Sequence, residues 1–223
     1  MLKKDKNYKQ IFFDLDGTLL DTAPEFSKSI NNLTLTRLNK EISFNEIRNL
    51  VSDGVGALVK LAFGVSENEE EFEIYRKELL NEYTKFYLDS SLFDEINKML
   101  EEIEEKGIIW GVVTNKPKYL AEKIFEKFDW HKRTEILICP QDVFDKRKPD
   151  PSSLNKAIED GGFNAEQSIY VGDNWRDSEA SVNAKTNFAY AGYGYGEKNS
   201  IKTENLQIIL SLIHISEPTR LSL

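Results

Sequence analysis

The chain has 223 residues and a formal net charge of −9, with 40% hydrophobic and 30% charged residues. This composition is typical of a soluble globular protein, and the length allows one substantial core with a small accessory module. The acidic balance argues against a nucleic-acid partner, which requires clustered lysine and arginine. The single cysteine excludes an internal disulfide, and two histidines argue against a histidine-built zinc site.

The N-terminal residues 1–7 lack the apolar stretch of a signal peptide, and no apolar run reaches membrane-spanning length. We therefore expect a cytoplasmic protein that has no membrane partner. Cys139 lies in the apolar run 136–139, which favours a buried structural thiol over a nucleophile. No sequence feature predicts the oligomeric state.

The first predicted strand, residues 11–13, ends at two carboxylates, Asp14 and Asp16. Because side chains alternate along a strand, both carboxylates can project to the same side, and Gly17 lets the chain turn sharply after them. Two like charges in one pocket require a cation or a shared proton. A surface turn after a buried strand is the simpler alternative, since Asp and Gly favour turns.

Two further candidate groups lie downstream. The apolar strand 108–113 ends at Thr114 and Asn115, and Pro117 suits the first turn of a helix, where N–H groups and a hydroxyl can hold a phosphate. Lys148 precedes a proline, which favours an extended backbone at the lysine. An extended lysine in this turn can direct its ammonium at the same phosphate. The alternatives are an ordinary helix cap at Thr114 and a solvated turn at Lys148.

Carboxylates also follow the predicted strand at residues 168–171. Asp173 and Asp177 lie just beyond it, and their oxygens suit a hard cation such as Mg²⁺, although Asp177 is also a candidate helix cap. Strands and helices alternate through residue 191, which predicts an α/β fold with a Rossmann-like, mostly parallel sheet. Ligands bind at the carboxyl ends of such strands, where these groups lie.

Residues 22–90 are predicted to form a helical insertion after the first strand end. A first helix has Phe26, Ile30 and Leu33 on one face, and a longer stripe of the same period comprises Phe72, Tyr75, Leu79, Tyr83 and Phe86. Both stripes are typical of helix packing. A later core helix, predicted to end at Gly107, carries Phe93, Ile96, Leu100 and Ile103.

These segments, in this order, resemble the haloacid dehalogenase-type hydrolases from about residue 11 to residue 209. The resemblance implies that Asp14 attacks phosphorus to form an aspartyl-phosphate and that Asp16 moves the proton. Thr114, Asn115 and Lys148 would then form the phosphate cradle.

The resemblance also implies a metal site and a division of the chain. Mg²⁺ would be held by Asp14, Asp173 and the main-chain carbonyl of Asp16, with Asp177 orienting the metal shell. The core would comprise residues 1–21 and 91–209, and residues 22–90 would form a C1-type cap that closes over the active site. A turn at Ser52 and Gly54 would face the substrate, and Arg48 and Lys60, which flank it, are candidate cations for an acid group of that substrate; a plain interhelical turn is the alternative.

Asp16 favours phosphatases over dehalogenases within this family, because a halide leaves without a proton. A sugar phosphomutase and a non-catalytic binding module are the alternative functions. Segments 21–24, 51–54 and 110–116 resemble the phosphoglycolate phosphatase-like group. Within that group, segments 109–117 and 137–140 resemble bacterial N-acetylmuramic acid 6-phosphate phosphatases. We therefore expect a small phosphate monoester as substrate, with N-acetylmuramic acid 6-phosphate ahead of 2-phosphoglycolate.

The C-terminal residues 210–223 resemble the translation of a transposase adapter used in sequencing libraries. We expect the native sequence to end near Ile209, and we exclude the tail from the fold prediction.

Overall fold

The computed structural model describes residues 8–197, 200–201 and 207–209. Its main sheet has six strands in the order β5-β4-β1-β6-β7-β8, and every neighbouring pair is parallel. The strands are β1 (Gln10–Phe13), β4 (Ile109–Val113), β5 (Leu137–Ile138), β6 (Ser168–Gly172), β7 (Asn187–Ala191) and β8 (Gln207–Ile209). The predicted parallel α/β sheet is thereby confirmed.

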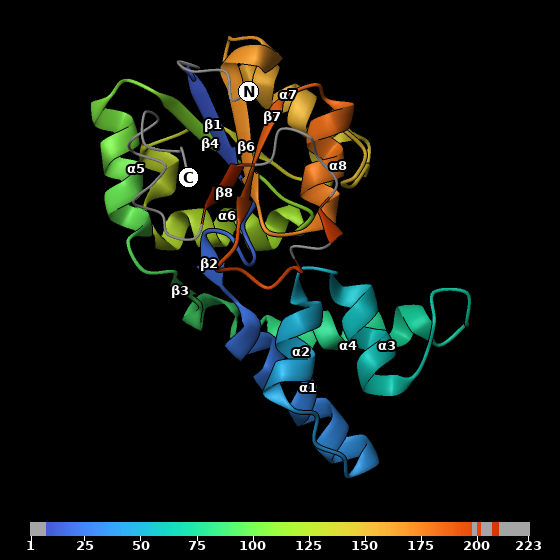
Figure 1. Cartoon of the computed structure of the whole chain (residues 1–223). Coiled ribbons are helices and arrows are strands. Elements are labelled where there is room, and N and C mark those ends of the chain that lie inside the picture. Colours follow the sequence, from blue (N-terminus) through green and yellow to red (C-terminus); the bar gives the residue numbers. More distant parts are fainter. Residues whose placement is uncertain (1–7, 198–199, 202–206, 210–223) are drawn as a thin grey trace.

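Helices cover both faces of this sheet (Figure 1). One face packs against α5 (Ile96–Glu105) and α6 (Lys118–Lys127), and the other packs against α7 (Ser152–Asp160) and α8 (Trp175–Asn183). Strand β1 supplies both cores, because Ile11 and Phe13 point to the first face and Phe12 to the second. Burial on both faces explains why the strand reads as an unbroken apolar run.

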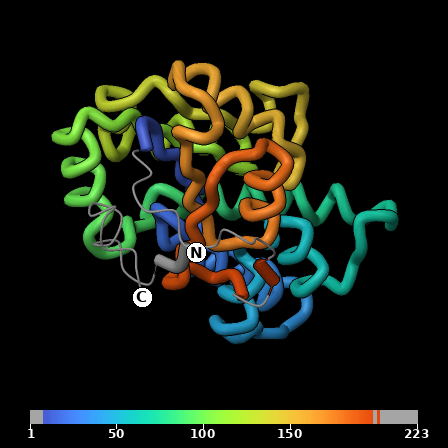
Figure 2. The backbone as a smooth tube through the Cα atoms, turned by 45° about the horizontal axis from the view of Figure 1, so that its top comes forward, coloured from blue at the N-terminus to red at the C-terminus, as the bar shows by residue number. Residues whose placement is uncertain are grey.

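Four helices form an insertion beyond the carboxyl ends of the strands (Figures 1 and 2). They are α1 (Ala23–Leu38), α2 (Phe44–Val51), α3 (Val55–Phe63) and α4 (Phe72–Tyr83). The insertion begins after β2 (Leu20–Asp21) and returns through β3 (Ser91–Leu92), and these two short strands pair antiparallel. The helices share a separate apolar cluster, which confirms the inserted helical cap, while its exact boundaries at residues 22 and 90 stay a prediction.

Two helix predictions were too long. Helix α4 ends at Tyr83, and the chain leaves it through i to i+3 hydrogen bonds, so Phe86 lies outside the stripe. Helix α5 begins at Ile96 because Glu95 adopts a left-handed backbone with φ of 66°, so Phe93 precedes the helix. The predicted end at Gly107 is confirmed, since its φ of 66° suits a C-terminal glycine.

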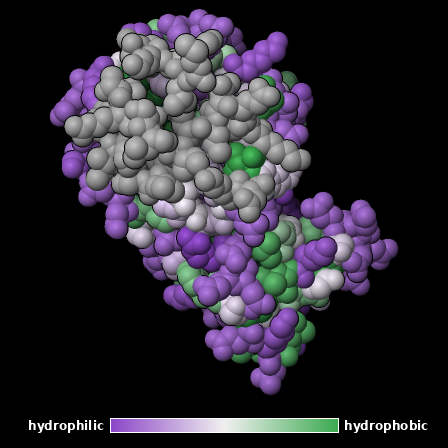
Figure 3. Space-filling model, viewed as in Figure 1, coloured by the Kyte–Doolittle hydropathy of each residue, from purple (hydrophilic) through white to green (hydrophobic). Residues whose placement is uncertain are grey.

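Short 3₁₀ turns connect several elements: η1 (Tyr87–Asp89), η2 (Trp130–Lys132), η3 (Pro140–Val143) and η4 (Ala165–Gln167). Cys139 is fully buried before η3, and burial raises the pKa of its thiol to about 12. A thiol that resists ionisation suits the predicted structural role better than that of a nucleophile. Among the described residues, no helix is long and apolar enough to cross a membrane. On the face shown in Figure 3, the cap is mainly hydrophilic with separate apolar patches. The predicted adapter-derived tail, 210–223, lies outside the described residues.

Candidate active site

A cavity of about 570 Å³ lies between the cap and the strand ends of the core. Core residues that line it include Asp14, Asp16, Thr114, Asn115, Lys148 and Asp177, and cap residues include Ser52, Gly54, Phe72 and Tyr83. Its size is in the usual range for a small-molecule site. The sheet therefore gathers most of the predicted site residues at one place, although they are separated by more than a hundred positions in the sequence.

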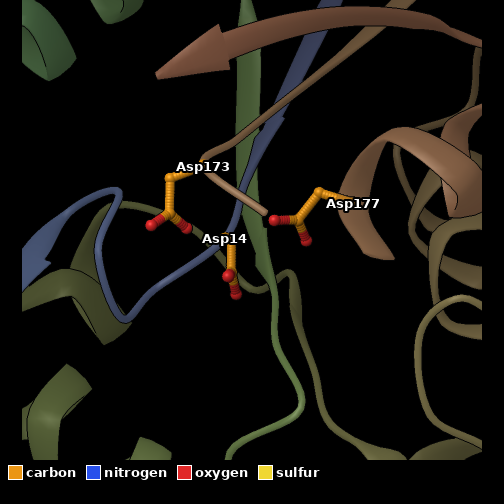
Figure 4. A group of neighbouring side chains, drawn as sticks. All are labelled: Asp14, Asp173 and Asp177. Carbon is orange, nitrogen blue, oxygen red and sulfur yellow. The ribbon is translucent and has the colours of Figure 1, made fainter. Parts of the chain in front are cut away.

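Three buried carboxylates gather here (Figure 4), and of these Asp14 and Asp177 line the cavity whereas Asp173 lies beside them without lining it. Asp14 follows β1, Asp173 follows the adjacent strand β6, and Asp177 lies in the first turn of α8. Each offers an oxygen, and these oxygens lie within 4.8 Å of one another. Gly17 allows this approach, because its φ is 82° and any side chain there would collide with the Asp173 carboxylate.

Lys148 neutralises part of this negative charge. Its Nζ lies 2.8 Å from Asp14 Oδ1 and 2.7 Å from Asp177 Oδ1, and it donates to the Tyr170 hydroxyl at 2.7 Å. Burial favours the neutral amine, but the attraction of Asp14 and Asp177 outweighs it and raises the pKa of Lys148. The lysine is therefore held charged although it is only 4% exposed.

Three neighbouring carboxylates share one ammonium, which contacts two of them, and this leaves a surplus of negative charge. Burial raises the pKa of Asp14 to about 8, despite the opposing effect of Lys148, and Asp177 and Asp173 raise it further. Burial likewise raises the pKa of Asp173 to about 7, with a further contribution from Asp177. Because burial and like charges disfavour the ionised forms of these two carboxyl groups, a second cation bound beside them would be favourable.

Asp173 also has an oxygen that is free to bind such a cation. Its Oδ2 accepts hydrogen bonds from the Ser52 hydroxyl at 2.7 Å and from the N–H groups of Tyr195 and Gly196. Its buried Oδ1 has no hydrogen-bond partner among the described residues. A buried, unpartnered carboxylate oxygen within an oxygen-only cluster fits a hard cation such as Mg²⁺. The N–H groups come from the loop after β7, for which the sequence predicted no role.

Asn115 fixes the position of Lys148 through its main chain. The Asn115 side chain accepts a hydrogen bond from the Lys148 N–H at 2.8 Å and donates to the Lys148 carbonyl at 3.1 Å. Thr114 is buried beside them at the end of β4, and its hydroxyl accepts from the Lys116 N–H at 3.1 Å. The structure thus brings all three predicted phosphate-binding residues together, while their contact with phosphate stays a prediction.

Lys116 and Tyr83 are site residues that the sequence analysis missed. Lys116 Nζ lies 2.8 Å from Asp16 Oδ1 and donates to the Tyr83 hydroxyl at 3.0 Å. Tyr83 belongs to cap helix α4, so Lys116 joins the cap to the carboxylate that is predicted to move the proton. Lys116 stands two residues after Thr114 at the same strand end, and this position is the signal that could have identified it.

A Lys116→Met variant should lower kcat on the order of 10²-fold, because Asp16 loses the contact that fixes its carboxylate. Steady-state phosphate release, with melting temperature as the check on folding, measures this effect. Lys118→Met is the matched control, since Lys118 pairs with Asp142 outside the cavity. An unchanged kcat for Lys116→Met would show that Asp16 needs no such support.

The cap turn is only partly as predicted. Ser52 and Gly54 line the cavity, and Ser52 contacts Asp173 directly. Arg48 does not reach the cavity, because its guanidinium donates to the Gly194 carbonyl at 3.0 Å and packs over the Tyr195 ring. Lys60 is exposed and also does not line the cavity, because it lies on the solvent-facing side of α3. Arg48 and Lys60 therefore flank the turn in sequence, but the helix positions that they occupy direct their side chains away from the cavity.

Comparison with known proteins agrees with this geometry. Residues 11–191 match the family described as Haloacid dehalogenase-like hydrolase. An N-acetylmuramic acid 6-phosphate phosphatase from Pseudomonas aeruginosa is 37% identical over 193 residues, which cover 86% of this chain and 85% of the relative. A phosphoglycolate phosphatase from Xanthomonas campestris pv. campestris is 36% identical over 192 residues, covering 84% of each.

A crystal structure described as a predicted phosphoglycolate phosphatase from Haemophilus somnus superposes with a TM-score of 0.78 at 26% identity, covering 94% of this chain and 96% of that one. The fold, the arrangement of strand-end residues and these similarities agree with one another. The chain belongs to the haloacid dehalogenase-like hydrolase family.

Proposed function

We propose that the protein is a Mg²⁺-dependent phosphomonoesterase that works through an aspartyl-phosphate. The observation that carries this proposal is the buried cluster of Asp14, Asp173 and Asp177, in which Asp14 and Asp177 pair with Lys148. The cluster lies at the strand ends, and Asp14 and Asp177 line a cavity of small-molecule size. Membership of a hydrolase family with phosphatase-named relatives supports the same reaction class.

In the proposed reaction, an Asp14 carboxylate oxygen bonds to phosphorus while the ester P–O bond breaks. The leaving alkoxide takes a proton from Asp16. Asp16 then accepts a proton from a water molecule whose oxygen attacks the phosphorus of the aspartyl-phosphate. Inorganic phosphate leaves, and the Asp14 carboxylate is restored.

The remaining residues hold the reacting groups in place. The Lys148 ammonium and the groups at Thr114 and Asn115 would contact the phosphoryl oxygens. Asp14, Asp173 and the main-chain carbonyl of Asp16 would hold Mg²⁺, which would supply positive charge next to the phosphoryl group. Asp177 would orient this shell through Lys148. The cap, which contacts the core through Tyr83 and Ser52, would exclude bulk water.

For the substrate, we propose a small phosphate ester that also carries an acid group. The first candidate is N-acetylmuramic acid 6-phosphate, which the name of the 37% identical relative supports. The second candidate is 2-phosphoglycolate, which the name of the 36% identical relative supports. Both are small enough to suit a cavity of about 570 Å³.

Phosphate release from a panel of phosphomonoesters, with Mg²⁺ and with excess chelator, tests the proposed reaction. We expect release only with Mg²⁺, because the buried carboxylates otherwise carry uncompensated charge. Restoring Mg²⁺ after chelation should restore the rate. Full activity in chelator would contradict the metal requirement, transfer between sugar hydroxyls without release would indicate a phosphomutase, and absence of turnover would favour a binding module.

A further inference from the structure

The cavity is lined by five arginine or lysine residues in the described part of the chain, and four of them are already paired with carboxylates of the protein. Lys148 pairs with Asp14 and Asp177, Lys116 with Asp16, Arg176 with Asp53 at 3.1 Å, and Arg76 with Glu73 at 3.1 Å. The fifth is Arg147. Across the described residues, its guanidinium has neither a carboxylate partner nor a hydrogen bond, although it lines the cavity.

The main chain around Arg147 is nevertheless well fixed. Asn115 holds the next residue, Lys148, by both its N–H and its carbonyl. The Arg147 carbonyl accepts a hydrogen bond from the Asp150 N–H at 2.9 Å, which closes the turn. The main chain from which the Arg147 side chain extends is therefore held in place beside Lys148.

Arg147 and Lys148 occupy different depths of the cavity. Lys148 is buried against Asp14, whereas Arg147 is exposed to solvent. A phosphorus atom that reacts with Asp14 must lie deep in the cavity, so the leaving group extends toward the opening. An unpaired guanidinium there is suited to a planar anion, because its parallel N–H groups match the two oxygens of a carboxylate.

We propose that Arg147 binds the carboxylate of an acid-bearing phosphate ester and so selects for such substrates. This inference rests on the proposed phosphatase function. It places recognition of the acid group on the core loop that carries Lys148. The cations predicted for this role, Arg48 and Lys60 of the cap, do not line the cavity.

The test compares N-acetylmuramic acid 6-phosphate with N-acetylglucosamine 6-phosphate, which lacks the lactyl carboxylate. In Arg147→Gln, the ratio of their kcat/KM values should fall about tenfold or more, as expected for loss of a charge-assisted hydrogen bond. The change should appear mainly in KM for the acid. Arg147→Lys, which keeps the charge, should recover part of the ratio. The same loss should appear for 2-phosphoglycolate measured against p-nitrophenyl phosphate.

Lys146→Gln is the matched control. Lys146 is the preceding cation, is exposed and does not line the cavity, so this variant should keep the wild-type ratio. An unchanged ratio in Arg147→Gln, or an equal fall for acidic and neutral esters, would overturn the role of Arg147 while phosphatase activity persists. Absence of phosphate release from every ester by the wild-type protein would overturn the proposed function, and this inference with it.

Discussion

Asp14→Asn is expected to lower kcat by roughly 10⁴-fold or more, because an amide of the same shape cannot serve as the nucleophile. The variant should remain folded. Burial raises the pKa of the Asp14 carboxyl, so the ionised form is disfavoured in the folded protein, and a neutral amide in its place avoids that cost. Lys148 keeps Asp177 as its partner at 2.7 Å.

Single-turnover phosphate release and thermal unfolding without metal measure the two parts of this prediction. The unfolding temperature of Asp14→Asn should be at least that of the wild-type protein. Substantial turnover by Asp14→Asn, with wild-type contamination excluded by separate expression and purification, would remove Asp14 from the role of nucleophile.

Lys148→Met is expected to lower both activity and stability. Without its ammonium, Asp14 and Asp177 lose their shared buried partner, which should cost roughly 3 kcal/mol of unfolding free energy in the absence of metal. The loss of a cation aimed at the phosphoryl group should lower kcat on the order of 10²–10³-fold. Denaturant unfolding and steady-state kinetics measure the two effects separately.

Lys146→Met is the matched control for charge and position, because Lys146 lies two residues away on the exposed side of the same turn. It should change neither quantity appreciably. If Lys148→Met kept wild-type kcat while remaining folded, Lys148 would have no part in stabilising the phosphoryl group. If its stability were also unchanged, the buried ion pairs would contribute nothing to the fold.

The strand-end residues were predictable because a strand end is a local feature. Asp14, Thr114 and Asp173 each follow an apolar run directly, and parallel pairing then places the three runs side by side. Lys148 was predictable from its position before a proline within the ordered set of motifs. The α/β class followed from the alternation of strands and helices.

Contacts between the cap and the core were not predictable in this way. The hydrogen bond from Lys116 to Tyr83 depends on how α4 sits above β4, which no spacing in the sequence specifies. The same limit explains Arg48 and Lys60, which are close to the turn in sequence but are turned away from the cavity by the phase of their helices. Arg147 could be identified only from the structure, because it stands out only once the other arginine and lysine residues that line the cavity are seen to pair with carboxylates.

Trapping the covalent intermediate tests the central claim most directly. The protein is mixed with Mg²⁺ and substrate, treated with borohydride, and digested for peptide sequencing by mass spectrometry, since reduction of an aspartyl-phosphate yields homoserine. We predict homoserine at position 14, dependent on both substrate and Mg²⁺, and unmodified aspartate at positions 16, 173 and 177. Homoserine at one of those three positions, or an unmodified Asp14 in a sample that is turning over substrate, would contradict the assignment of Asp14 as the nucleophile.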